Sequence, residues 1–253
     1  MTAGEPPQGR PRPRPATPTD VSAAIEQRRR REARRRRTTM AAAVGMLGFA
    51  LVLVWLVRFS PVLAARSVEV TGTQLVTTEQ VLQAADVPMG TPIATLDTTA
   101  VAQRVAEQLT GVGRVSVHTR LPGTVVVEVT ERTAVYERRT AAGYQWVDAS
   151  GVIFNTTAKH TKGVPVATTD GVENRLLADV ATVVKALPPA LRKRLDHVAA
   201  SSPDDIVLQL DKGQQVLWGS AAASQDKARV VLVLLGQQAT VFDVSSPGTP
   251  STR

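Results

Sequence analysis

The sequence predicts an α+β protein that begins with a single transmembrane helix. Three observations carry this prediction. The uncharged apolar segment 40–57 is long enough to cross a bilayer. Roughly the next seventy residues follow the order strand, helix, helix, strand, strand, and the remaining sequence is richer in strands. We therefore expect a membrane anchor, a small α+β domain and a second, β-rich domain with flanking helices.

The positive charge of the chain is concentrated at its N-terminal end. The 253 residues have a net charge of +8, but residues 1–37 hold 11 arginines and 4 acidic residues, so the remainder is nearly neutral. This segment is rich in proline and poor in large apolar side chains, which predicts a disordered basic tail over 1–37. A protein that binds nucleic acid specifically would have a basic folded surface, so we expect no specific nucleic-acid partner. The arginines can still attract anionic lipid or contact phosphates without specificity.

Residues 38–58 are predicted to form the transmembrane helix. Met40–Val57 contains no charged residue and spans roughly 27 Å at about 1.5 Å per residue. The arginine runs Arg28–Arg31 and Arg34–Arg37 precede it, and the positive-inside rule therefore places the N-terminus in the cytoplasm and the later domains outside. Two alternatives are a buried core helix and a signal peptide cleaved near Val62-Leu63-Ala64. The long leader and long apolar run favour an uncleaved anchor in the plasma membrane.

Residues 66–135 have the pattern of a small domain with two helices on one sheet. Ser67–Val70 alternates like a strand, and Thr77-Thr78-Glu79-Gln80 is typical of a capping box that opens a helix. Asp97 can cap a second helix that ends near Gly111. A hairpin follows, with valines at alternate positions on both sides of the turn Pro122-Gly123.

Residues 136–245 are predicted to form the β-rich domain. Two hairpins are expected, at Tyr144–Phe154 and Ile206–Trp218, each around a turn of polar residues and glycine. An amphipathic helix lies between them, from Leu176 to Leu187, and a second one is expected from about Ala222 to Gln238. The strand Thr240–Val244 closes the domain, and residues 246–253 are predicted to be a disordered tail.

The sequence contains no recognisable catalytic or metal-binding pattern. The chain has no cysteine, which excludes disulfides, thiolate metal sites and cysteine nucleophiles. The three histidines, His118, His160 and His197, are scattered, and no phosphate-binding loop, dinucleotide fingerprint or nucleophile elbow occurs. We therefore expect no enzymatic activity and no cofactor. The alternative is a membrane-anchored hydrolase with an unrecognised site, which would require titratable groups gathered in a pocket.

The order of these segments resembles the FtsQ/DivIB family of bacterial cell-division proteins over about residues 25–245. The family has a basic cytoplasmic tail, one span, a POTRA domain and a β-rich domain. The matching segments are Val68-Glu69-Val70-Thr71-Gly72, Arg120–Val129 followed by Glu131-Arg132, Trp146-Val147-Asp148 with Gly151-Val152, the positions Gly213, Val216, Gly219 and Lys227, and Val241-Phe242-Asp243-Val244.

The resemblance implies a scaffold of the division septum that links early ring components to septal peptidoglycan synthesis. Its implied partners are the bitopic proteins FtsB and FtsL and, through them, the septal peptidoglycan synthase complex. A different function, a POTRA-bearing chaperone of outer-membrane assembly, would usually add a transmembrane β-barrel, and no run of long alternating strands follows.

The predicted partner surface is the closing strand. A strand at a sheet edge leaves N–H and C=O groups free for a partner strand, and the resemblance places partner binding in this part of the domain. The residues assigned to this surface are Thr240, Val241, Phe242, Asp243, Val244 and Ser245, together with Lys227 and Arg229 of the preceding helix. The alternative interpretation is an ordinary edge strand that Asp243 protects from pairing.

Overall fold

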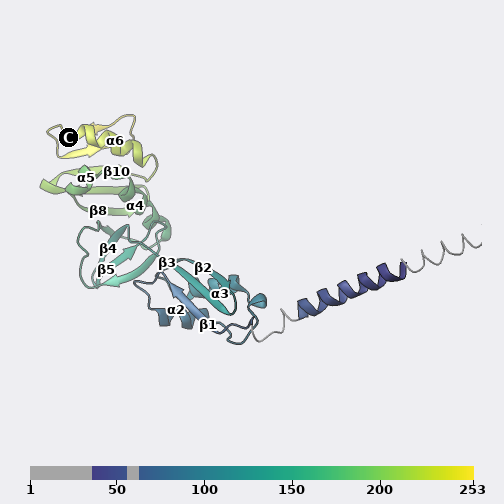
Figure 1. Cartoon of the computed structure of the whole chain (residues 1–253). Helices are drawn as coiled ribbons and strands as arrows, with labels where there is room; N and C mark the ends of the chain where they lie inside the picture. The colour runs from purple at the N-terminus through teal and green to yellow at the C-terminus, as the bar shows by residue number, and fades with distance from the viewer. Residues whose placement is uncertain (1–35, 56–62) are drawn as a thin grey trace, which may run out of the picture. The chain divides into compact units, whose positions relative to one another are not determined.

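The computed structural model describes residues 36–55 and 63–253 (Figure 1). These residues fall into two compact units, Met1–Ser60 and Pro61–Arg253. The predicted basic tail, residues 1–37, therefore lies almost entirely outside the described residues.

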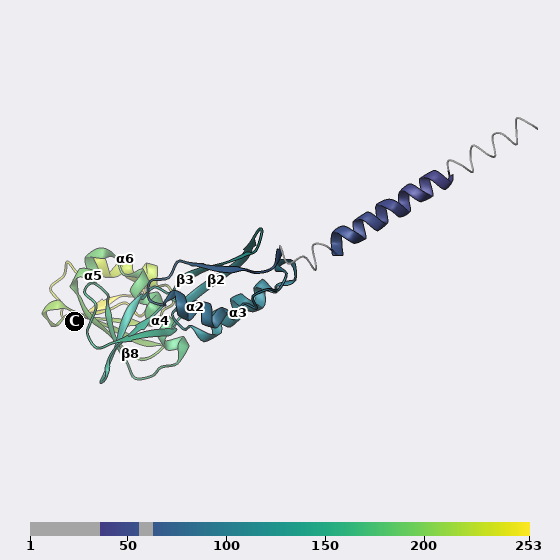
Figure 2. The same cartoon turned by 60° about the horizontal axis from the view of Figure 1, so that its bottom comes forward.

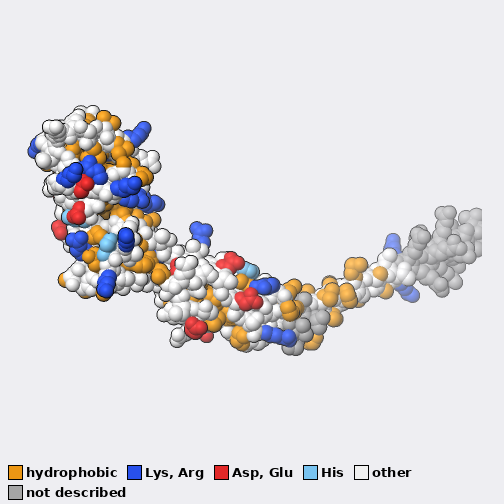
Figure 3. Space-filling view, turned by 60° about the vertical axis from the view of Figure 1, so that its left-hand side comes forward, with side chains coloured by type: hydrophobic (Ala, Val, Ile, Leu, Met, Phe, Trp, Pro, Cys, Tyr) orange, Lys and Arg blue, Asp and Glu red, His pale blue; other side chains and the backbone are white. Residues whose placement is uncertain are grey.

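The first unit contains the helix Arg36–Trp55. An 18-residue window of this helix has a mean hydropathy of 1.9, and none of the window is buried within the protein. Large apolar side chains such as Met46, Leu47 and Phe49 are exposed, and Figure 3 shows hydrophobic side chains along the helix. By length and composition this is a candidate membrane-spanning helix, and it covers most of the predicted span 38–58.

The second unit begins with a three-stranded sheet covered by two helices. Its elements are β1 (Ser67–Thr71), α2 (Thr78–Ala85), α3 (Thr98–Gln108), β2 (Val112–Arg120) and β3 (Thr124–Glu131). The strand order is β1-β3-β2, with β1 parallel and β2 antiparallel to β3. Figure 2 shows α2 and α3 on the same side of this sheet. The predicted order of strand, helix, helix, strand, strand is confirmed.

Local signals explain where these elements begin. The Thr77 hydroxyl accepts a hydrogen bond from Gln80 N, and Gln80 Oε1 accepts one from Thr77 N, which completes the predicted capping box. Asp97 caps α3 by accepting from Ala100 N at 3.0 Å. Val81, Val101 and Val105 of the helices are fully or almost fully buried, and they form one apolar cluster with the inward-facing valines of β3, which are Val125, Val127 and Val129.

The β-rich domain is built on a nine-stranded sheet. Its strands are β4 (Tyr136–Thr140), β5 (Gly143–Val147), β6 (Ile153–Thr157), β7 (Val166–Thr169), β8 (Leu195–Ser202), β9 (Asp205–Leu210), β10 (Gln215–Gly219), β11 (Val241–Asp243) and β12 (Ser251–Thr252). Across the sheet they lie in the order β12-β11-β10-β9-β8-β7-β4-β5-β6. The domain's helices are α4 (Asn174–Ala186), α5 (Pro189–Arg194) and α6 (Ser224–Leu234).

A second apolar cluster, separate from the first, forms the core of this domain. One face of α4 contributes Leu177, Val180 and Val184, all buried, and the central strands contribute Leu208 and Trp218. Side chains on the opposite sheet face are partly exposed, as expected for a mainly antiparallel sheet with helices on one side.

The structure differs from the sequence prediction in three respects in this domain. Residues 246–253 are not a disordered tail, because Ser251–Thr252 forms β12, which pairs antiparallel with β11. Helix α6 is shorter than predicted and ends at Leu234, since the segment 235–239 continues as turns toward β11. Strands β4, β7 and β8 were also not predicted individually, because their sequences lack a clear alternation of apolar and polar residues.

Candidate interaction surface

The candidate surface is the end of the nine-stranded sheet that contains β10, β11 and β12. Strand β11 runs parallel to β10, with Gln215 opposite Val241. Gln215 N donates to Thr240 O at 2.8 Å, and Val244 N donates to Leu217 O at 3.0 Å. Side chains on β11 alternate, so that Phe242 is fully buried while Val241 and Asp243 are partly exposed.

The predicted free edge at Thr240–Ser245 is already occupied in the structure. Val241 N donates to Arg253 O at 3.0 Å, Arg253 N donates to Val241 O at 2.9 Å, and Thr240 N also donates to Arg253 O. The expectation that the closing strand is the outermost strand is therefore wrong, because β12 lies outside it. A strand of two residues among serine, threonine and proline gives no periodic signal in the sequence.

The residues assigned to the surface do not all face outward. Phe242 and Val244 have no exposed area and belong to the core, so their side chains support the strand from within the domain. Asp243 is engaged locally, since its Oδ1 accepts hydrogen bonds from Ser245 N at 3.0 Å and Ser245 Oγ at 2.7 Å. The Thr240 N–H group and both main-chain groups of Val241 face β12 and are the groups that a pairing strand uses.

Lys227 is a support of the sheet end and is not an exposed binding residue. It is only 1% exposed, and its Nζ donates to Trp218 O at 2.9 Å and to Ser220 O at 2.8 Å. Burial lowers the pKa of this amine below its ordinary value. Lys227 is therefore buried in the structure, and its part in partner binding stays a prediction. Lys227 lies on the inward-facing side of α6, and its hydrogen bonds connect α6 to the end of β10.

Arg229 does face outward, and it borders a hollow on the outer side of α6. Its guanidinium forms an ion pair with the Asp226 carboxylate one turn earlier. The hollow has a volume of about 500 Å³ and is lined by Asp226, Arg229, Val230, Val233, Pro247 and Gly248. Val233 is 77% exposed, so an apolar side chain is presented beside the strand edge.

A second site, not assigned from the sequence as functional, joins the two parts of this unit. Glu131 ends β3, and its carboxylate accepts hydrogen bonds from three consecutive main-chain groups, Gln74 N, Leu75 N and Val76 N. Partial burial raises the pKa of Glu131, but these three donors outweigh it, so that the pKa lies below its ordinary value. Glu131 thus holds the loop after β1 to the end of β3.

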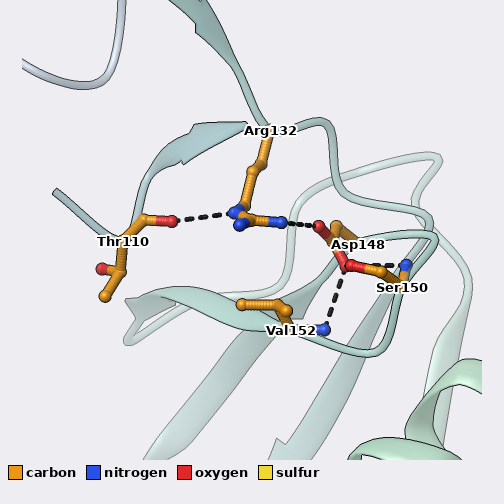
Figure 4. A network of polar contacts seen from close by, with 5 residues as sticks. All are labelled: Thr110, Arg132, Asp148, Ser150 and Val152. Carbon is orange, nitrogen blue, oxygen red and sulfur yellow. Dashed lines mark hydrogen bonds and ion pairs between the residues drawn. The ribbon is translucent and has the colours of Figure 1, made fainter. Parts of the chain in front are cut away.

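Arg132 connects the same strand end to the β-rich domain (Figure 4). Its Nε donates to Thr110 O at 3.0 Å, and its Nη1 forms an ion pair with Asp148. Asp148 also accepts from Ser150 N and Val152 N, at 2.8 and 2.9 Å. Burial raises the pKa of Asp148, but the hydrogen bonds from Val152, Ser150 and Arg132 lower it below its ordinary value.

The histidines do not form a catalytic cluster with one another. His160 pairs with the buried Glu137, and His197 pairs with its neighbour Asp196. Over the ranges 36–55 and 63–253, no group of three or more histidine, cysteine, aspartate or glutamate residues could hold a metal ion.

The fold defines a class of protein in which one candidate membrane helix precedes a POTRA domain and a β-rich domain. The FtsQ-type POTRA domain family matches residues 63–132, and the C-terminal domain family of cell division protein FtsQ/DivIB matches residues 135–245. Together these matches cover nearly the whole second unit.

Individual relatives agree with this assignment. Cell division protein FtsQ of Mycolicibacterium smegmatis is 36% identical over 215 residues, which cover 84% of this chain and 63% of that protein. The FtsQ proteins of Streptomyces collinus and Streptomyces coelicolor are 35% and 33% identical over 78% and 82% of this chain, and the matched regions cover 81% and 86% of those relatives. The chain belongs to the FtsQ/DivIB family of cell-division proteins, as the sequence motifs indicated.

Proposed function

We propose that this protein is a non-catalytic scaffold of the divisome, anchored in the plasma membrane at the division septum. In this proposal the β-rich domain binds FtsB- and FtsL-type bitopic proteins outside the cytoplasm. The scaffold thereby links early ring components to the septal peptidoglycan synthase complex. Family membership and the candidate membrane-spanning helix support this placement.

The proposed orientation places the N-terminus in the cytoplasm. It rests on the 11 arginines within residues 1–37, because basic residues beside a span stay on the cytoplasmic side. Alkaline phosphatase fused after residue 253 is expected to be active, whereas the same enzyme fused before residue 1 is expected to be inactive. Fluorescent protein fusions should give the reverse pattern. Phosphatase activity from the N-terminal fusion alone would contradict the orientation.

The observation that supports the proposed partner surface is that the nine-stranded sheet ends in two very short strands. Strand β11 has three residues and β12 has two, so the main-chain groups beyond β10 are covered by very little structure. An edge of this kind can accept another strand through main-chain hydrogen bonds. The exposed Val233 and the hollow beside α6 supply apolar surface next to that edge.

The variant Val241→Pro tests this surface. Val241 N donates outward to Arg253 O, so proline removes a donor on the partner side and leaves the main-chain hydrogen bonds between β10 and β11 in place. We expect co-purification with co-expressed FtsB- and FtsL-type proteins of the same organism to fall about tenfold or more. The measurement is quantitative affinity purification of the full chain from membranes.

Val241→Ala is the matched control, because it shortens the same side chain and keeps the N–H group. Val244→Pro is a poorer test, since Val244 is fully buried and its N–H donates inward to Leu217 O. Undiminished co-purification of a folded Val241→Pro protein would remove this edge from the proposal.

A further inference from the structure

Residues 246–253, which we call the strap, follow β11 and return along its outer edge. Ser251 lies opposite Asp243 and Thr252 opposite Phe242 in an antiparallel register. The main-chain bonds between Val241 and Arg253 run in both directions, and Thr240 N adds another to Arg253 O. The strap therefore occupies the position that an added partner strand would take.

We propose that the outer edge of β11 is a strand-accepting site that the strap fills within the chain, and that a partner strand binds by exchanging with the strap. This inference rests on the proposed function and specifies how the partner binds, namely by replacing the strap. The partner segment that fits is an extended strand, because the groups left by the strap are main-chain donors and acceptors.

The contacts of the strap make it replaceable. None of its residues is buried, and only Pro247 and Thr252 are partly covered. Apart from the main-chain bonds, Thr252 Oγ1 donates to Gln237 Oε1 at 3.2 Å, and Thr240 Oγ1 donates to Arg253 O at 3.4 Å. The strap contributes no side chain to the apolar core, so another sequence can form the same main-chain bonds.

Strand β11 is held quite differently on its inner side. Phe242 and Val244 are fully buried in the core, and β11 pairs with β10 over three residues. Loss of the strap therefore leaves β11 in place with its outer edge open. The residues that hold β11 in the core are thus different from the residues of the strap, so the strap can leave without disturbing the core, as an exchange requires.

The strap pairs with only a short part of β11. Ser251 is the last residue of the strap with a paired position, and continuing the register places Pro250 opposite Val244, whose N–H donates inward to Leu217 O. The pairing that a partner strand has to replace is therefore short. Pro247 and Gly248 of the strap also line the hollow beside α6, so departure of the strap widens this hollow beside the exposed Val233, where an apolar partner side chain fits.

A reversible lock on the strap tests the exchange. The chain has no cysteine, so Asp243→Cys with Ser251→Cys introduces one defined pair at directly opposed positions. Opposed residues of antiparallel strands have the separation that a disulfide needs. Partner capture by the full chain is measured on the oxidised and reduced forms of the same protein. The apparent affinity of a site is proportional to the fraction of molecules in which the site is open. We therefore expect the oxidised protein, in which the disulfide holds the strap in place, to capture at least about tenfold less of the FtsB- and FtsL-type proteins than the reduced protein.

Two further variants separate the possible outcomes. Asp243→Cys alone controls for loss of the Asp243 bonds to Ser245 and should not respond to oxidation. A chain lacking residues 246–253 should capture the partners at least as strongly as the unaltered chain. Equal capture by the oxidised and reduced lock overturns the exchange and leaves the proposed function standing. Absence of capture in every form, including the strap-deleted chain, overturns the proposed function and the exchange with it.

Discussion

Replacing Trp218 by alanine is expected to lower the free energy of unfolding of the β-rich domain by about 3–5 kcal/mol. Trp218 lies on β10 with no exposed area, and it is the largest side chain in the core of this domain. Its Nε1 donates to Ser224 Oγ at 3.1 Å, which ties β10 to the first turn of α6. The measurement is denaturant unfolding of the full chain in detergent, followed by circular dichroism.

Two milder variants divide this effect into its parts. Trp218→Phe keeps an aromatic ring but loses the indole N–H. Ser224→Ala keeps the indole but removes its acceptor, together with the hydrogen bond that the Ser224 hydroxyl donates to Ala221 O. We expect Ser224→Ala to lower the free energy of unfolding by about 1 kcal/mol. The loss for Trp218→Phe should lie between the losses for Ser224→Ala and Trp218→Ala. A Trp218→Ala protein with unchanged unfolding would mean that this sheet end is not packed as described.

Replacing Asp148 by alanine is expected to lower the free energy of unfolding by about 3 kcal/mol, because it removes one member of a partly buried ion pair and several hydrogen bonds. The Asp148 side chain is 10% exposed and that of Arg132 is 23% exposed, so solvent replaces these contacts poorly. Ser150 N and Val152 N also lose their acceptor. Denaturant unfolding at neutral pH measures the loss.

The pH dependence of stability separates the contribution of the Asp148 charge from that of its side-chain shape. Since the pKa of Asp148 is lowered in the folded protein, its stabilisation is complete above the ordinary pKa of about 3.8 and is lost as the pH falls through the folded value. The difference in stability between the unaltered protein and Asp148→Asn should therefore shrink below about pH 4. The pKa of Glu131 is also lowered, so acid removes its stabilisation as well. Glu131→Gln therefore measures how much of the acid sensitivity of the unaltered protein comes from Glu131. A difference that stays constant with pH would contradict this assignment.

Local signals in the sequence were sufficient for the POTRA domain. The capping box at Thr77, the Asp97 cap and the alternating valines of β3 each act through near neighbours in the chain, and the structure confirms all three. The sequence also indicated helices α4 and α6 and the paired strands β9 and β10 of the second domain, because their apolar residues recur with the helical or strand period.

The parts that the sequence did not predict depend on contacts between distant segments. Strand β12 exists because its main chain meets β11, and its own residues carry no strand pattern. Lys227 was assigned to the partner surface because the resemblance places partner binding in this part of the domain. Its ammonium group instead donates hydrogen bonds to two carbonyl groups at the end of β10. Likewise, nothing near Arg132 in the sequence indicates that Asp148 is its partner.

The order of strands has a mechanical consequence for the β-rich domain. The Arg132–Asp148 contact lies beside β5, near one end of the nine-stranded sheet, whereas β12 forms the other end. With strands about 4.8 Å apart, the eight intervals from β6 to β12 extend roughly 38 Å. The sheet thus acts as a stiff spacer, so that force arriving through the POTRA connection crosses the strands between β5 and β12 before it reaches the segment where a ligand strand would attach.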